Sequence, residues 1–204
     1  MTLARAAADL ANGRTTARAL VESCLAAIAD PSGEGTRTFT RTYANQARDS
    51  ADAMDLLRRV GRAPGPLAGI PISLKDLLDV RGETTAAGST VLADAAPAEA
   101  HAATVQRVLA AGLVPVGRTN MTEFAFSGIG INPHHGTPKA PWDRATGRVP
   151  GGSSSGAAVS VADGMALAAQ GHGLLGPRGA AGAARDRGQA VDLPPLTKGR
   201  DVRR

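Results

Sequence analysis

The stretch PLAGIPISLKD at residues 66–76 decides the fold class of this 204-residue chain. It opens with turn-forming proline and glycine, after which apolar residues alternate with others in the order Ile70, Pro71, Ile72, Ser73, Leu74 and Lys75. A period of two is typical of a β-strand, because successive side chains point to opposite faces of a sheet. We therefore predict a strand here, with Lys75 on the face opposite the three aliphatic side chains.

Helical patterns and a second strand surround this segment. Apolar residues recur at helical spacing over residues 15–29, 44–60 and 101–111, and a threonine is available as N-cap of the first helix. Residues 113–116 form the second predicted strand. Because helices and strands alternate along the chain, we expect an α/β domain built in layers.

The last predicted element follows GGSSSG at residues 151–156. The small side chains of AAVSVADGMALAAQ predict a closely packed helix over residues 157–170. Beyond it the periodicity is lost, and the composition shifts to Gly, Ala, Arg and Pro without any aromatic residue. We expect one domain over residues 1–170 and an aberrant, disordered tail over residues 171–204.

The net charge of +5 is unevenly distributed. Residues 171–204 hold seven Lys and Arg against three Asp, which accounts for +4 of the total. Aromatic residues make up only 2% of the chain, so nucleic-acid bases would find little to stack on. We therefore expect no nucleic-acid partner. The alternative is that the basic tail binds nucleic acid.

The location of the protein is predicted from its apolar runs. None approaches the roughly 20 residues of a membrane-spanning helix, and the start, MTLARAAADLANGR, lacks a signal-peptide core. We expect a cytoplasmic protein without a membrane partner. The single cysteine, Cys24, lies in the periodic run LVESCLAAI, which predicts a buried apolar residue and no disulfide within the chain.

Two segments carry side chains suited to catalysis. GGSSSG could be a linker, but the helix predicted after it would direct backbone N–H groups toward Ser153–Gly156, where they could stabilise negative charge. Lys75 could be a solvated surface charge. Burial among its apolar neighbours would instead lower its pKa until the neutral amine could accept a proton.

These segments belong to a set that resembles the amidase signature family, whose members hydrolyse carboxamides. The most specific matches are PLAGIPISLKD, VGRTNMTEFAF at residues 116–126 and RVPGGSSSGAAVSVADGMA at residues 148–166, with APWDR at residues 140–144 beside them. The resemblance covers residues 1–170. It implies a layered mixed sheet covered by helices and a small-molecule amide as substrate. We expect no cofactor and no metal ion.

The resemblance also implies a catalytic triad of two serines and a lysine, related to the serine and lysine variants of the serine-hydrolase template. By motif, Lys75 is the lysine and Ser153 is the bridging serine, which follows a cis peptide bond from Gly152. Ser153 would pass a proton from the nucleophilic serine to neutral Lys75. We therefore expect Lys75 and Ser153 to lie close together.

Further roles follow from the same resemblance. We expect five residues to support the serine loop: Gly151, Gly152, Ser154, Ser155 and Gly156. The two serines among them would do so through hydrogen bonds. Ala125 and Ser127 fall where the family lines its substrate pocket, with an ordinary loop as the alternative. Asp76 either orients its loop or is solvated, and we favour the structural role.

The chain departs from the family after residue 170. The family continues into a loop of the type GTDTGGSVRIP, whose serine is the nucleophile, whereas this chain has GHGLLGPRG. The nucleophile is expected near Pro177, and no serine occurs after Ser160. A frameshift would explain the break and a truncated family domain, because a shifted reading of GHGLLGP permits a loop close to the missing one. A C-terminal extension with its own role is the alternative.

Three functions remain open from the sequence. The leading one is hydrolysis of a linear carboxamide to a carboxylate and ammonia or an amine, by a chain that is itself inactive because its nucleophile is missing. The second is the A subunit of a glutamine amidotransferase, which supplies ammonia for tRNA-dependent amidation. The third is a non-catalytic remnant. The oligomeric state is not predicted.

Overall fold

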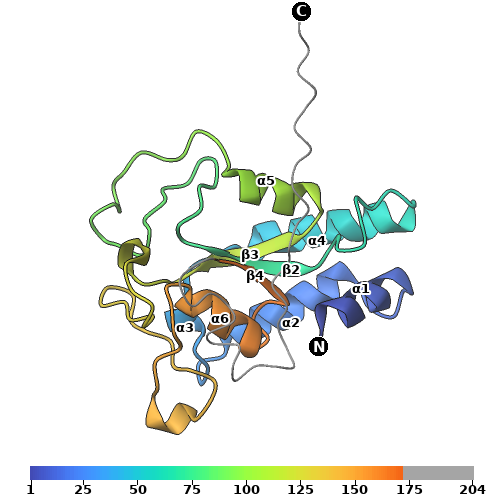
Figure 1. Ribbon diagram of the computed structural model, residues 1–204. Coiled ribbons are helices and arrows are strands. Elements are labelled where there is room, and N and C mark those ends of the chain that lie inside the picture. Colours follow the sequence, from blue (N-terminus) through green and yellow to red (C-terminus); the bar gives the residue numbers. More distant parts are fainter. Residues whose placement is uncertain (172–204) are drawn as a thin grey trace, which may run out of the picture.

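The strand predicted from residues 70–75 is one of two interior strands of the sheet. The computed structural model describes residues 1–171, and its sheet has four strands in the order β1-β3-β2-β4 (Figure 1). Their bounds are Phe39–Thr42 for β1, Pro71–Lys75 for β2, Val114–Thr119 for β3 and Ala168–Gln170 for β4. Strand β2 is parallel to β3 and β4, and β1 is antiparallel to β3. The sheet is therefore mixed, as predicted.

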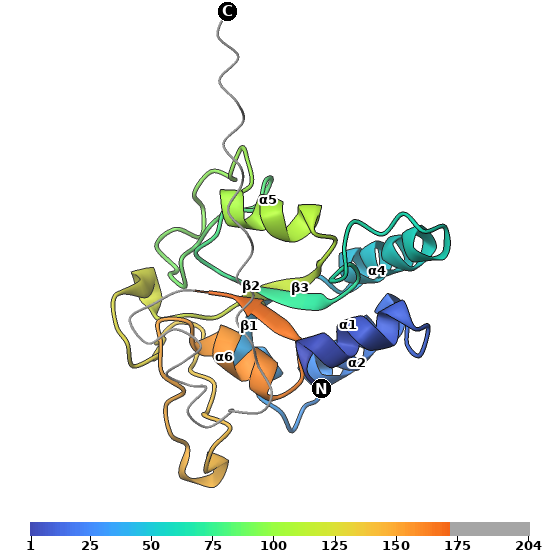
Figure 2. The same ribbon diagram turned by 45° about the vertical axis from the view of Figure 1, so that its right-hand side comes forward.

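Helices cover both faces of this sheet. The α-helices are Leu3–Ala11 (α1), Ala17–Ala29 (α2), Gly35–Thr38 (α3), Ala44–Arg59 (α4), Ala103–Ala110 (α5) and Ser155–Ala162 (α6). Short 3₁₀ helices span Glu123–Ala125 (η1) and Arg144–Thr146 (η2). Figures 1 and 2 show α5 on one side of the sheet and α6 on the other. All five residues of β2 are consequently buried.

The three helices predicted from residues 15–29, 44–60 and 101–111 are confirmed. Thr16 caps α2, because its side chain accepts a hydrogen bond from Ala19 N at 3.0 Å. Gly61 and Gly112 follow α4 and α5 with φ values of 68° and 75°, a left-handed backbone that favours glycine. Cys24 is buried in α2 as expected, and burial raises the pKa of its thiol to about 12.

The helix predicted over residues 157–170 is wrong in its second half. Helix α6 ends at Ala162, and Gly164 turns the chain at a φ of 74°. Residues 168–170 then form β4, which pairs with residues 72–74 of β2. Alanine favours helices by a few tenths of a kcal/mol per residue, and the backbone hydrogen bonds available along the buried edge of β2 outweigh that preference.

Helix α1 and strand β1 were not predicted, and neither were the short helices α3, η1 and η2. Helix α1 lies in the alanine-rich start of the chain, and β1 is a four-residue edge strand with only Phe39 buried. No helix within residues 1–171 is long and apolar enough to cross a bilayer. The disorder expected over residues 171–204 concerns positions that, except for Gly171, lie outside the described residues.

Candidate functional site

Lys75 and Ser153 meet in the interior, where β2 ends and the turn before α6 begins. Lys75 Nζ lies 2.7 Å from Ser153 Oγ, and the two residues are 0% and 2% exposed. The prediction that they lie close together is therefore confirmed, and the surface alternative for Lys75 is wrong. A lysine in hydrogen-bonding contact with a buried hydroxyl is an arrangement suited to proton transfer.

The fold brings the two residues together through the packing of α6 on the sheet. Ser73, two residues before Lys75 on the same face of β2, lies within hydrogen-bonding distance of α6, with its Oγ 2.9 Å from Ser160 Oγ. Ser160 Oγ donates to the carbonyl of Ala157 at 2.8 Å, so the Ser73 hydroxyl donates to Ser160. This buried contact fixes α6 on β2, and the turn that carries Ser153 is held over Lys75.

Burial sets the electrostatics of the lysine. Removal of the side chain from water disfavours the charged ammonium and lowers the pKa of Lys75 to about 8. An appreciable fraction of Lys75 is therefore a neutral amine near neutral pH, and a neutral amine can accept a proton from Ser153 Oγ.

The GGSSSG segment is a tightly enclosed turn and not a solvated linker. The peptide bond between Gly152 and Ser153 is cis, as expected. Gly152 N donates to Gly128 O at 2.8 Å, and Ser153 O accepts from Thr122 N at 3.0 Å. A Cβ at Gly152 would lie 2.7 Å from Gly130 Cα, so only glycine fits there. The turn therefore packs directly against the loop that follows β3.

Asn120 anchors the other side of this turn, a role that sequence reasoning missed. Gly156 N donates to Asn120 O at 2.9 Å, and Asn120 Nδ2 donates to the carbonyls of Arg37 and Gly136. The signal available in the sequence was a polar side chain four residues after the end of the predicted strand at 113–116. Asn120 is completely buried, which agrees with a structural role in joining α3, α6 and the loop at Gly136.

The two remaining serines of the segment differ from expectation in one respect. Ser154 is the N-cap residue of α6, but its side chain makes no capping hydrogen bond. Ser155 Oγ is buried and has no hydrogen-bond partner within residues 1–171. The expected support of the loop by the Ser155 hydroxyl is therefore not found.

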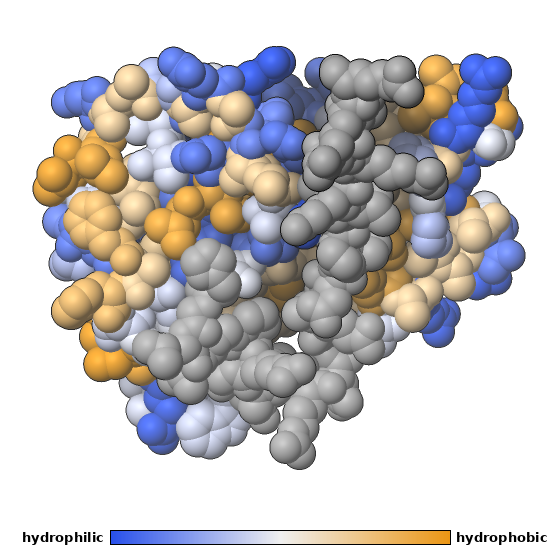
Figure 3. Space-filling model, turned by 45° about the horizontal axis from the view of Figure 1, so that its top comes forward, coloured by the Kyte–Doolittle hydropathy of each residue, from blue (hydrophilic) through white to orange (hydrophobic). Residues whose placement is uncertain are grey.

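Ala125 and Ser127 lie in the loop that packs against the serine turn. Both are half-buried, and Ser127 Oγ accepts a hydrogen bond from Ile129 N at 3.2 Å. Exposed apolar side chains gather in this loop and in the segment after it, namely Phe124, Phe126, Ile129, Ile131 and Trp142. Figure 3 shows hydrophobic surface on this side of the molecule. The substrate-binding role of Ala125 and Ser127 stays a prediction.

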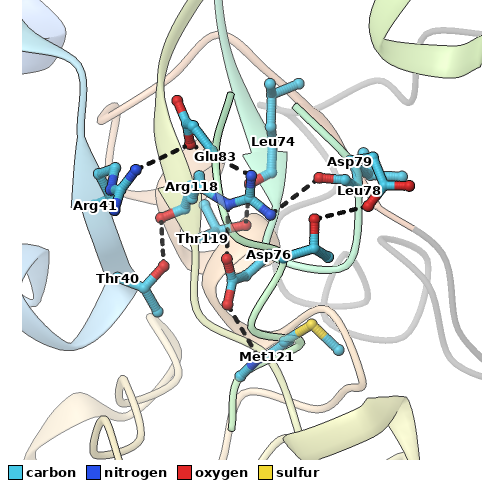
Figure 4. Close-up of polar contacts among 12 residues, drawn as sticks. Thr40, Arg41, Leu74, Asp76, Leu78, Asp79, Glu83, Arg118, Thr119 and Met121 are labelled. Atoms are coloured by element: carbon cyan, nitrogen blue, oxygen red, sulfur yellow. Dashed lines mark hydrogen bonds and ion pairs between the residues drawn. The ribbon is translucent and has the colours of Figure 1, made fainter. Parts of the chain in front are cut away.

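Asp76 is buried and ion-paired, so the solvated alternative is wrong and the structural role is confirmed. Its Oδ1 accepts from Arg118 Nε at 2.7 Å, and its Oδ2 accepts from Gly88 N at 3.0 Å. Arg118 is only 2% exposed. Figure 4 shows the two side chains directed toward each other. Sequence reasoning missed Arg118, whose signal was a charged residue two positions after the predicted strand at 113–116.

Two further expectations concern a metal site and the nucleophilic serine. Within residues 1–171, no group of three or more His, Cys, Asp or Glu side chains is arranged to hold a metal ion. The nucleophile position expected near Pro177 lies outside the described residues. The site that the structure describes therefore consists of a lysine, a serine and the two loops that enclose them.

The sequence and fold of this chain are similar to those of known proteins. A family model described as Amidase matches residues 19–173. The AtzE subunit of 1-carboxybiuret hydrolase from Pseudomonas sp. (strain ADP) is 43% identical over 76% of this chain and 34% of its own length. The A subunit of glutamyl-tRNA(Gln) amidotransferase from Chloroflexus aggregans is 41% identical over 84% of this chain and 34% of its own.

Solved structures of amidases have the same fold as this chain over the part that they share with it. A crystal structure of an amidase superposes with a TM-score of 0.73 at 36% identity, over 84% of this chain and 38% of that one. The chain thus spans about a third of the length of the relatives that it matches. The shared part contains the sheet, Lys75 and the serine turn.

Proposed function

Because the chain belongs to the amidase family, we propose that Lys75 and Ser153 form the proton-transfer part of the site of an amide hydrolase. The observation that carries this proposal is the buried contact of 2.7 Å between Lys75 Nζ and Ser153 Oγ. Burial lowers the pKa of Lys75 to about 8, so its amine can serve as a base near neutral pH.

The proposed reaction needs a second serine as nucleophile. Its hydroxyl oxygen attacks the carbonyl carbon of a carboxamide and passes its proton to Ser153 Oγ, while the Ser153 proton moves to neutral Lys75 Nζ. The carbon–nitrogen bond then breaks, and the leaving nitrogen takes a proton back from Lys75 through Ser153. Water attacks the resulting ester by the same proton route. The products are a carboxylate, ammonia or an amine, and the free serine.

We propose that this chain itself does not complete the reaction. The stretch GHGLLGPRG stands where the family places its nucleophile loop, and the family model stops matching at residue 173. The test is ammonia release from a panel of simple aliphatic and aromatic amides. We expect no release above background. Turnover that disappears in Lys75→Ala and Ser153→Ala would contradict the proposal, because another serine would then act as nucleophile.

A frameshift is our proposed origin of the break. DNA sequencing through the codons for Gln170 to Gly176 tests it. The sequenced DNA either encodes a loop of the GTDTGGS type in one of its reading frames or does not. The frame-restored protein should release ammonia from an amide, and Lys75→Ala or Ser153→Ala should abolish that release. DNA in which no reading frame beyond the codon for Gln170 encodes such a loop would overturn the frameshift.

The A subunit of a glutamine amidotransferase is the second candidate. Its support is the 41% identity to the corresponding chain of glutamyl-tRNA(Gln) amidotransferase from Chloroflexus aggregans. The two candidates differ in the amide that they use. A frame-restored protein that releases ammonia from glutamine only when partner subunits are added would favour the amidotransferase. Release from simple amides by the protein alone favours the hydrolase.

A further inference from the structure

Two neighbouring residues at the end of β2 send buried charged groups to opposite faces of the sheet. Asp76 N donates to Thr119 O at 3.1 Å, so the ladder between β2 and β3 continues one residue beyond Lys75. Successive side chains along an extended backbone point in opposite directions. Lys75 accordingly reaches Ser153 on the face of α6, whereas Asp76 reaches Arg118.

Arg118 holds the Asp76 carboxylate within a balanced group of charges. Besides Asp76, it donates to Leu78 O at 3.0 Å and to Glu83 Oε2 at 3.4 Å. Glu83 in turn lies 3.3 Å from Arg41. Figure 4 shows the two arginines and two carboxylates meeting where β1, β3 and the loop after β2 converge. The charges of this group cancel.

Another titratable neighbour of this group is Tyr43, the residue before α4. Its hydroxyl donates to Glu83 Oε2 at 2.6 Å, and burial together with Glu83 raises the pKa of Tyr43, which keeps it neutral. Burial opposes the charge of Arg118, but the charge and hydrogen bond of Asp76 act together with Tyr43 and Glu83, and the net effect raises the pKa of the guanidinium. Arg118 is therefore a cation throughout the pH range in which Lys75 titrates.

This arrangement matters for a lysine that must lose its proton. A carboxylate beside an amine favours the ammonium form, and a cation beside it favours the neutral amine. Asp76 is the carboxylate nearest to Lys75 along the chain, and both of its oxygens accept hydrogen bonds from Arg118 and Gly88. Its charge is thereby neutralised by a partner and its orientation is fixed.

We propose that Arg118 and Asp76 are positioning residues for Lys75: their buried ion pair fixes the end of β2 and prevents the Asp76 carboxylate from acting as counter-ion of the Lys75 amine. The inference rests on the proposed function, in which Lys75 accepts a proton. Arg118 is needed to neutralise the carboxylate, and Asp76 is needed to neutralise the arginine, so loss of either one disturbs the lysine in an opposite sense.

The test is a measurement of the pKa of Lys75 in the full 204-residue chain by NMR. The chain has three lysines, Lys75, Lys139 and Lys198, so side-chain labelling of lysine gives few signals, and Lys75→Met assigns the one of interest. We expect Arg118→Gln to raise the pKa of Lys75 and Asp76→Asn to lower it, each by about one. Asp163→Asn removes a carboxylate paired with Arg144 at the far end of α6 and should change nothing.

A second pair of variants keeps the test decisive should the single variants not fold. Glu83→Gln removes one charge from the outer, partly exposed side of the group and should lower the pKa of Lys75 by less than Asp76→Asn does. The double variant Asp76→Asn with Arg118→Gln removes opposite charges and should leave the pKa of Lys75 as it is in the unmodified chain. A rise in Glu83→Gln, or a shift in the double variant as large as that expected of Arg118→Gln, would overturn the proposal.

The outcome for the unmodified chain separates this inference from the proposed function. A Lys75 that titrates near the ordinary lysine value of about 10.4 would contradict its role as a base. A Lys75 that titrates near 8, but whose pKa moves in the same direction or not at all in Arg118→Gln and Asp76→Asn, would leave that role intact and would overturn only the positioning by the ion pair.

Discussion

Lys75 and Asp76 are adjacent in the chain and both buried, yet the fold treats their charges in opposite ways. Asp76 receives an arginine and a backbone N–H, so its charge is matched. Lys75 receives the hydroxyl of Ser153, and burial lowers its pKa. A matched buried charge stabilises a structure only as long as its partner stays, whereas a buried group with a lowered pKa becomes available for proton transfer. At the end of β2, one face of the sheet therefore carries the structural ion pair of Asp76, and the other carries the lysine suited to proton transfer.

The largest effect should come from breaking the matched pair. Arg118→Ala leaves the Asp76 carboxylate buried without its cation, and we expect it to lower the free energy of unfolding by about 3–5 kcal/mol. Urea denaturation followed by circular dichroism measures the change. Arg144→Ala is the control, because Arg144 also pairs with a carboxylate but is 34% exposed, and it should cost less than about 1 kcal/mol. Equal losses in the two variants would contradict the contrast.

The lysine face predicts a dependence of stability on pH. The pKa of Lys75 is about 8 in the folded protein, below its ordinary value, so the folded state binds fewer protons than the unfolded state between these two values. The cost of burying the ammonium is therefore present below pH 8 and is relieved as the pH rises toward about 10.4.

The change is isolated by comparison with Lys75→Met, which carries no charge at this position. The free energy of unfolding of the unmodified chain should rise relative to that of Lys75→Met by about 3 kcal/mol between these pH values. Urea denaturation at several pH values gives this difference. A difference that stays constant with pH would show that Lys75 has an ordinary pKa.

Tight packing of the serine turn gives the next effect. In Gly156→Ala the new methyl group would lie 2.7 Å from Asn120 N and would also meet Thr38 O, both of them backbone atoms that cannot move aside easily. We expect a loss of about 1–3 kcal/mol and a change in the NMR signal of Lys75, since the turn over it is displaced. Gly65→Ala, where a Cβ meets open space, is the matched control and should change stability by less than about 1 kcal/mol.

Residues with a local pattern were predictable from the sequence, and those that depend on distant partners were not. The alternation at residues 70–75 predicts β2 and the face of Lys75, because period two is a property of the strand itself. The residues of β4 carry no such pattern, and their strand exists because β2 offers an edge to pair with. Arg118 and Asn120 were missed for the same reason, since their partners lie 42 and up to 83 residues away in the chain.

The smallest effect concerns the contact that holds α6 on the lysine face. Ser73 donates to Ser160, and Ser160 donates to the carbonyl of Ala157. Ser73→Ala therefore leaves Ser160 with a partner and should cost about 1 kcal/mol or less, whereas Ser160→Ala leaves the buried Ser73 hydroxyl without its acceptor and should cost about 1–3 kcal/mol. Urea denaturation of the two variants measures this asymmetry, which a simple loss of one hydrogen bond would not produce.

Neither change alters a charge, so the pKa of Lys75 should stay at about 8 in both. The pKa of Lys75 should rise in Arg118→Gln. If it rose equally in Ser73→Ala, the packing of α6 on β2 and not the ion pair would determine the pKa of Lys75, and the contrast between the two faces would be wrong.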